Sequence, residues 1–272
     1  VSKPRISLPP APSFIEPETM RQSLKLYHTN KLFQFLSFHF GQEATEELML
    51  RYHVGTSKHW PGATVFWQVD ISGRVRTGKV MLYNPENGRR IKEPHNYITW
   101  VHSLLKKENF NLRQCLFGEH LLTSDQQRPV ALVESEKSAL ISSFYLPQYL
   151  WIASGGKNGA FNRDAMSVLL FPDLGATDYW NSKMEMIRSL GIEVSLFDFM
   201  ERNATKEERD AGYDIADFLL REETKEAILN RLITLNPALK TLVETFDLQL
   251  VDVKKAPFSA TVQHAREGLF KR

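Results

Sequence analysis

Two carboxylates near the middle of the chain stand where phosphate chemistry could take place. Glu134 directly follows the short apolar run 130–133, and Asp173 comes just after a second run, 167–171. In alternating strand and helix segments, ligands bind at the carboxyl ends of the parallel strands. Acids from two strands would meet there, and carboxylate oxygens suit Mg²⁺ or Mn²⁺ in sites that process phosphates. We therefore expect Glu134 and Asp173 to lie close enough to share one cation.

The order of segments after Pro129 predicts the fold around these acids. The predicted elements are strand 130–133, helix 136–144, strand 149–152, strand 167–171, helix 177–190 and strand 193–197. Such alternation is typical of a mainly parallel sheet flanked by helices. We assign the chain to the α/β class, with an α+β part at its N-terminal side.

The upstream half has a different periodicity. Apolar positions within 18–52 recur at helical spacing and are interrupted at Gly41, which predicts two helices. Residues 64–83 alternate as in a β-hairpin with a Ser72-Gly73 turn, and 98–106 has the pattern of a helix. This half should therefore contain a small antiparallel sheet with helices beside it.

The end of the chain predicts a helical tail that is broken near Pro237, with a closing strand at 248–253. The beginning holds five prolines within its first 17 residues, which favours extended backbone. Four parts result: a Pro-rich arm (1–17), a basic α+β module (18–128), a parallel-sheet module (129–221) and a helical tail (222–272).

Charge is distributed unevenly between the two central modules. The net charge is +2, but residues 74–113 hold nine Lys and Arg against three Glu, while 130–220 hold 14 Asp and Glu against eight Lys and Arg. Clustered cations on a hairpin can follow a phosphate backbone, so we expect single-stranded DNA or RNA as a partner. The expected contacts are Lys58, Arg74, Arg76, Lys79, Arg89, Arg90 and Lys137.

Three aromatic residues near this cluster, Trp60, Trp67 and Tyr83, are candidates for stacking on bases. The alternative is a solvated strand face whose aromatic residues belong to the core. The scattered histidines lack the close spacing of a zinc site.

Composition limits the class of protein further. Cys115 is the single cysteine, which excludes an intrachain disulfide and indicates a reducing compartment. No apolar run is long enough to span a bilayer, and the N-terminus lacks the apolar core of a signal peptide. We expect a soluble, cytoplasmic protein with no membrane association.

The acidic half resembles the toprim domain shared by primases, topoisomerases and some nucleases. Val130–Ala139 is similar to its first motif, a strand ending in Glu, and Leu170–Gly175 to its second, a strand ending in Asp-x-Asp. Trp151–Gly156 and Gly212–Asp217 are similar to the intervening strand with its Gly turn and to the acidic turn after the last strand. The resemblance implies a Rossmann-like toprim fold with Mg²⁺ or Mn²⁺ as cofactor. The implied metal ligands are Glu134, Asp173, Asp178, Asp214 and Asp217, the first two of them catalytic.

Two positions depart from the toprim pattern. Gly175 stands where the family has the second Asp of its pair, and Ser138 where primases usually carry an acid. Asp178, one turn into the next helix, is a partial substitute for the missing oxygen. The alternative is that Glu134 and Asp173 only cap helices, because carboxylates near helix N-termini are stabilised by free N–H groups.

The resemblance continues upstream. Ala63–Arg76 and Leu116–Gly118 are similar to the strand pair and short element before the toprim module of bacterial primases. Gly55–Thr64, Arg76–Met81 and Gln114–Leu122 are similar to motifs of uncharacterised primase-like toprim proteins of Bacteroides-type bacteria and their mobile elements, and this similarity covers about 27–221. Longer members carry a zinc ribbon in front, so a chain beginning with Val is expected to be a fragment.

Three functions follow from this resemblance. The leading one is Mg²⁺-dependent nucleotidyl transfer, that is, primer synthesis from nucleoside triphosphates in replication of bacterial DNA or mobile elements, with a helicase or another replication protein as partner. The second is a nucleic-acid-binding protein whose catalytic centre has decayed, which Gly175 favours. The third is a toprim-type nuclease that uses the same acids.

Overall fold

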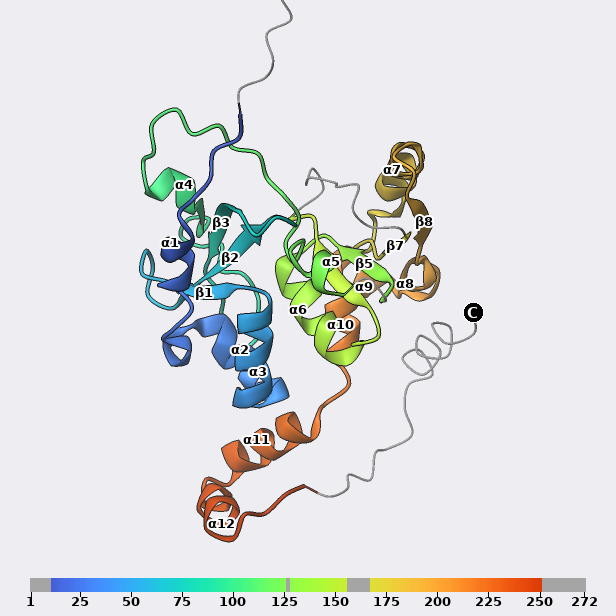
Figure 1. Ribbon diagram of the computed structural model, residues 1–272. Coiled ribbons are helices and arrows are strands. Elements are labelled where there is room, and N and C mark those ends of the chain that lie inside the picture. Colours follow the sequence, from blue (N-terminus) through green and yellow to red (C-terminus); the bar gives the residue numbers. More distant parts are fainter. Residues whose placement is uncertain (1–10, 126–127, 156–166, 251–272) are drawn as a thin grey trace, which may run out of the picture.

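A computed structural model describes residues 11–125, 128–155 and 167–250, and shows a mixed α/β chain built on two four-stranded sheets (Figure 1). The first sheet is antiparallel, in the order β1-β2-β3-β4. The second is parallel, in the order β6-β5-β7-β8. The predicted combination of a parallel sheet and an α+β part is therefore confirmed at this level. None of the helices described is long and apolar enough to cross a membrane.

The antiparallel sheet is preceded by helices that pack against it. Asn30 connects the two: its Oδ1 accepts hydrogen bonds from the N–H groups of Leu32 and Phe33 and from the Thr64 hydroxyl, and its Nδ2 donates to the Gly55 carbonyl. The elements are α1 (Pro17–Arg21), the 3₁₀ helix η1 (Tyr27–Thr29), α2 (Lys31–Phe40), α3 (Gln42–Arg51), β1 (Val54–Ser57), β2 (Ala63–Val69), β3 (Val75–Met81), β4 (Ile98–Trp100), α4 (Val101–Leu104) and α5 (Leu121–Ser124).

Two predictions for this half are confirmed and one is partly wrong. Gly41, with φ of +82°, separates α2 from α3, and β2 pairs with β3 as the predicted hairpin. Residues 98–100, however, form β4 rather than the start of a helix, because they pair with 79–81 of β3. Pairing with a neighbouring strand overrides local helical periodicity.

The parallel sheet follows the predicted alternation closely. Its β5 is buried on both faces, as expected for a central parallel strand. The elements are β5 (Val130–Val133), α6 (Glu136–Tyr145), β6 (Leu150–Ala153), β7 (Ser167–Leu170), α7 (Thr177–Ser189), β8 (Glu193–Leu196), α8 (Phe199–Asn203), α9 (Lys206–Ala211) and α10 (Ile215–Leu219).

The tail is helical and broken near Pro237, as predicted. Its α11 (Lys225–Leu235) packs on α2, and α12 (Ala238–Phe246) lies further from the sheets (Figure 1). Residues 248–250 form no strand, and the rest of the predicted strand 248–253 lies outside the described residues, as does most of the Pro-rich arm.

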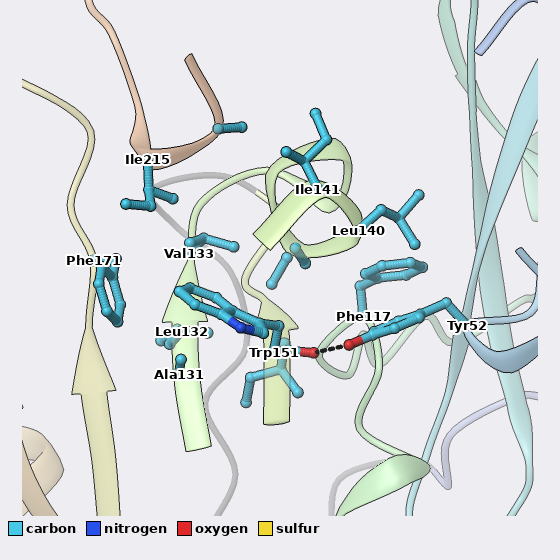
Figure 2. Packing of buried hydrophobic residues seen from close by; sticks show 14 of the residues in the cluster. Tyr52, Phe117, Ala131, Leu132, Val133, Leu140, Ile141, Trp151, Phe171 and Ile215 are labelled. Carbon is cyan, nitrogen blue, oxygen red and sulfur yellow. Dashed lines mark hydrogen bonds between the residues drawn. The ribbon is translucent and has the colours of Figure 1, made fainter. Parts of the chain in front are cut away.

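The two sheets share one apolar core, and edge strand β6 is where they meet. The Tyr52 hydroxyl donates a hydrogen bond of 2.9 Å to the Trp151 carbonyl, and the Tyr52 ring stacks on Phe117 (Figure 2). Phe117 and Ala153 exchange backbone hydrogen bonds as an antiparallel bridge. Residues from the other half of the chain thus pair with the edge strand of the parallel sheet. Such pairing satisfies the backbone N–H and C=O groups that an edge strand would otherwise leave without partners.

We expect Tyr52→Phe to lower the free energy of unfolding by about 1–3 kcal/mol, because the Trp151 carbonyl loses a buried donor. Urea unfolding measures this loss. Tyr27→Phe is the matched control, since it removes a buried 3.0 Å hydrogen bond to the Val54 carbonyl within the first half. Only Tyr52→Phe should also speed hydrogen exchange of the Ala153 amide. Unchanged stability and exchange in Tyr52→Phe would contradict the role of this contact.

Candidate functional site

The predicted acids lie along the carboxyl edge of the parallel sheet. Leu132 of β5 is in register with Leu170 of β7, so Glu134 and Asp173 both follow their strands at this edge. The Leu174 N–H donates to the Tyr213 carbonyl, which places Asp214 beside the same edge. Tertiary structure therefore gathers acids from three separate segments, and their sharing of one cation stays a prediction.

Glu134 is buried and has a hydrogen-bond partner that sequence reasoning missed. The indole N–H of Trp180 donates to Glu134 Oε1 at 2.9 Å. Trp180 comes from the buried face of α7, 46 residues later in the chain. In the sequence, this contact has one sign: a tryptophan on the apolar face of the helix that follows Asp173. The bond orients one carboxylate oxygen of Glu134 and occupies part of its capacity as an acceptor.

Asp214 and Asp217 form a capping box at the start of α10. Asp214 Oδ1 accepts the N–H groups of Ala216 and Asp217, and Asp217 Oδ2 accepts the N–H of Asp214. The Ser138 hydroxyl donates to Asp214 Oδ2. Burial and the nearby charge of Asp214 raise the pKa of Asp217, and Lys137 and Arg89 oppose this rise. Asp214 and Asp217 therefore cap α10, whereas the helix-capping alternative stated above concerns Glu134 and Asp173.

Position 175 is occupied by a different kind of contact. Gly175 has φ of +80°, and its N–H donates to Glu201 Oε2 at 3.0 Å. This bond, together with Arg209 and Thr177, holds the pKa of Glu201 below its ordinary value. An acid from α8 therefore lies next to the position where toprim domains carry their second Asp, and the sequence pattern gave no sign of it. Asp178 lies in the first turn of α7.

Within the described residues, no group of three or more His, Cys, Asp or Glu side chains is placed to hold a metal ion. Among the predicted ligands, Asp214 and Asp217 accept backbone N–H groups of α10, and Glu134 accepts the Trp180 indole N–H. Binding of Mg²⁺ or Mn²⁺ by these acids stays a prediction.

Three of the predicted phosphate-binding cations form internal ion pairs. Arg74, just before β3, and Arg76, within it, both bind Asp70 Oδ2, at 3.0 and 2.8 Å. Lys79 binds Glu136 Oε2 and the Gly155 carbonyl, each at 3.1 Å. Arg76 and Lys79 are only 12% exposed, so their first role is to join elements of the fold.

The other predicted cations lie nearer solvent. Lys58 and Arg89 are exposed, and Arg90 and Lys137 are half-buried. Of the three aromatic candidates for stacking, Trp67 and Tyr83 belong to the core, as the alternative proposed. Trp67 lies in β2, which is buried along its whole length, and Tyr83, just after β3, is buried too. Trp60 alone keeps part of its ring exposed.

Trp60 belongs to a continuous surface row of rings, which we call the aromatic row. Ring centroids are 4.4 Å apart for His59 and Trp60, 5.3 Å for Trp60 and Tyr97, and 4.1 Å for Tyr97 and His95. Two distant segments, before β2 and before β4, supply these rings. The sequence analysis found the first segment and missed the second.

Next to the aromatic row lies a cavity of about 330 Å³ between η1 and the β1–β2 turn, which we call the Lys58 pocket. Leu26, at its wall, has a left-handed backbone with φ of +58°. Its described lining contains two lysines, three hydroxyl side chains and no acid: Gln22, Lys25, Leu26, Thr29, Thr56, Ser57, Lys58, Pro61 and Gly62. Lysines and hydroxyls without a competing carboxylate are suited to an anion.

The comparisons with known proteins begin with one family model. The model described as a domain of unknown function, DUF6371, matches residues 30–174, which is more than half of the chain. The chain belongs to the DUF6371 family. The matched range of DUF6371 runs from the Asn30 cap through β7 to Leu174, and so includes both Glu134 and Asp173. A comparison with curated proteins gives no significant match.

Solved structures similar to this DUF6371 protein are parts of primases. The DnaG catalytic core matches with a TM-score of 0.46 at 14% identity, over 85% of this chain and 88% of that one. The RNA polymerase domain of Mycobacterium tuberculosis primase DnaG matches at 0.45 and 11%, over 93% and 96%. The zinc-binding and RNA polymerase domains of Aquifex aeolicus primase match at 0.40 and 12%, over 84% and 68%. All three are distant similarities, and the toprim and mobile-element assignments stay predictions.

Gly175 offers a test of the predicted metal site. Gly175→Asp and Gly175→Ala should each lower the free energy of unfolding by about 1–2 kcal/mol, because a side chain at φ of +80° is strained although a Cβ meets no atom within 4 Å. The Asp variant alone should then gain melting temperature on addition of Mg²⁺, since a ligand stabilises the state that binds it. Equal responses of the two variants to Mg²⁺ would remove position 175 from the metal prediction.

Proposed function

We propose that the protein binds single-stranded nucleic acid across the outer end of its antiparallel sheet. The observation that carries this proposal is the Lys58 pocket, whose described lining holds two lysines and no acid, directly beside the aromatic row. Phosphate needs cations and hydroxyl donors, and unpaired bases need exposed ring faces. Here both lie on one surface.

The single-stranded form is favoured by the rings. A base can stack on Trp60 or Tyr97 only when it is not stacked within a duplex, whereas lysines alone would bind either form. The exposed Lys58 and His59 adjoin Trp60 in the chain, so a backbone phosphate in the pocket and a base on the indole would be neighbours of one strand.

A second candidate function is primer synthesis at the carboxyl edge of the parallel sheet. It is supported by the position of Glu134 and Asp173 at the same edge and by the toprim-like motifs that contain them. Lys137 and Arg89, close enough to lower the pKa of Asp217, would supply positive charge for nucleoside triphosphates. In this reading the protein acts in replication of bacterial DNA or mobile elements in the cytoplasm, beside a helicase or another replication protein.

Lys58→Ala should weaken binding of a fluorescein-labelled oligothymidylate and reduce the slope of log affinity against log salt by about one unit, because one phosphate contact is lost. Fluorescence anisotropy at several salt concentrations measures both. Trp60→Ala should weaken binding with little change of slope, since stacking releases no counterion.

Lys206→Ala, on the exposed face of α9, is the matched control and should change neither affinity nor slope. Arg76→Ala tests the earlier assignment in the same assay, because Arg76 affects the slope only if it contacts phosphate in spite of its pair with Asp70. A Lys58→Ala slope equal to that of Lys206→Ala would overturn the proposed interface.

For the second candidate, Glu134→Gln should abolish any primer synthesis with Mg²⁺ or Mn²⁺ while leaving stability almost unchanged, because a Gln oxygen still accepts the Trp180 N–H. Glu207→Gln, the same change at an exposed position of α9, is the control. Incorporation of labelled nucleotides on a single-stranded template is the readout. Oligonucleotide binding without synthesis by the wild type would favour the binding-only protein, and metal-dependent cleavage of labelled DNA the nuclease.

A further inference from the structure

A second cavity lies against β7 and β8, the outer strands of the parallel sheet. Along β7 and β8 the residues alternate: Val168, Leu170 and Val194 are buried, whereas Glu193 and Ser195 are exposed. Parallel sheets are normally covered on both faces, and their strands are then apolar throughout. β8 is the edge strand of this sheet, and its polar residues Glu193 and Ser195 are exposed within the described part of the chain.

The cavity on this face measures about 450 Å³, within the usual range for sites that hold small molecules. It is lined on one side by partly exposed aromatic rings, those of Tyr149, Phe197 and Phe199. The rings continue inward, because Phe197 lies 4.8 Å from the buried Phe171 and 6.0 Å from Phe199, centroid to centroid. Such a wall is suited to a flat aromatic ligand.

The polar side of the cavity selects against anions. Glu193 and Asp198 line it, and its single described cation, Arg202, binds Asp198 at 2.8 Å. The hydroxyls of Ser167 and Ser195 complete this side. Carboxylates accept hydrogen bonds and repel phosphate, so the favoured ligand carries N–H donors and no negative charge.

We propose that this cavity, which we call the β8 pocket, binds an amino-substituted aromatic heterocycle such as the base of an adenine nucleoside. The base lies against the aromatic wall and its amino group faces the carboxylates. The lining of the β8 pocket shares no residue with the Lys58 pocket and includes neither Glu134 nor Asp173. The proposal does not depend on the proposed function.

Isothermal titration with nucleosides tests the β8 pocket. Adenosine should bind more tightly than inosine, in which an oxygen acceptor replaces the amino donor, and more tightly than adenosine monophosphate, whose phosphate meets the carboxylates. Glu193→Gln should weaken adenosine binding roughly tenfold, because a hydrogen bond to a charged acceptor is lost. Equal binding of adenosine and inosine, or no binding of adenosine at millimolar concentration, would overturn the proposal.

A pair of tryptophan variants locates the binding. Ser195→Trp places a large ring in the cavity from an exposed strand position and should abolish adenosine binding. Ser182→Trp, on the exposed face of α7, is the matched control and should bind like the wild type. Circular dichroism shows whether each variant is folded. Adenosine binding that survives in folded Ser195→Trp would place the ligand elsewhere and refute the β8 pocket. Neither variant touches the Lys58 pocket, so oligonucleotide binding should persist in both.

Discussion

The arrangement of this protein depends on how the edge of its parallel sheet is covered. Edge strand β6 would present unpaired N–H and C=O groups to water, and here they are met by the Phe117 bridge to Ala153 and by the Tyr52 hydroxyl. Both partners belong to the half of the chain that builds the antiparallel sheet. The larger of the two buried clusters therefore spans both sheets, and in it the rings of Tyr52, just after α3, and Phe117, before α5, lie against β6 (Figure 2).

This junction fixes where charged side chains can act. Lys79 reaches from β3 to Glu136 at the start of α6, two residues after Glu134. Arg76 is largely buried against Asp70, which also binds the half-exposed Arg74 and accepts the N–H groups that close the hairpin turn. Charges that are removed from water in this way need partners, because an unpaired buried ion is costly. The cations best placed for a ligand are accordingly those on the periphery.

The carboxyl edge of the parallel sheet shows the same effect for acids. Asp214 and Asp217 hold the N-terminus of α10, and burial next to Asp214 raises the pKa of Asp217. The toprim pattern has a second aspartate at position 175. Here the residue is Gly175, and its backbone N–H donates to Glu201. These acids therefore stabilise the helix and the turn at this edge, in addition to any ligand that they bind.

Several features of the protein were determined by sequence alone. Period-two runs and the strand-helix alternation predicted the hairpin, the break at Gly41 and the parallel sheet, because the side of a strand or helix that faces the core is recorded in its local spacing of apolar residues. Glu134 and Asp173 each follow a strand of the parallel sheet. Because parallel strands have their carboxyl ends at the same edge, the sequence also predicted that both acids lie at that edge. Even here, β4 was mistaken for a helix, because its pairing with β3 is a longer-range contact.

Only the tertiary structure decided which side chains remain available to a ligand. Arg76 and Lys58 look alike in a sequence, yet one is paired with a buried Asp70 and the other lines an acid-free pocket. Tyr97 joins Trp60 in the aromatic row across 37 positions of sequence, and Trp180 meets Glu134 across 46. Such partners are set by how helices and sheets dock, and no local periodicity records them. Composition can therefore indicate that a chain binds phosphate or bases, but the surface that does so is chosen by packing.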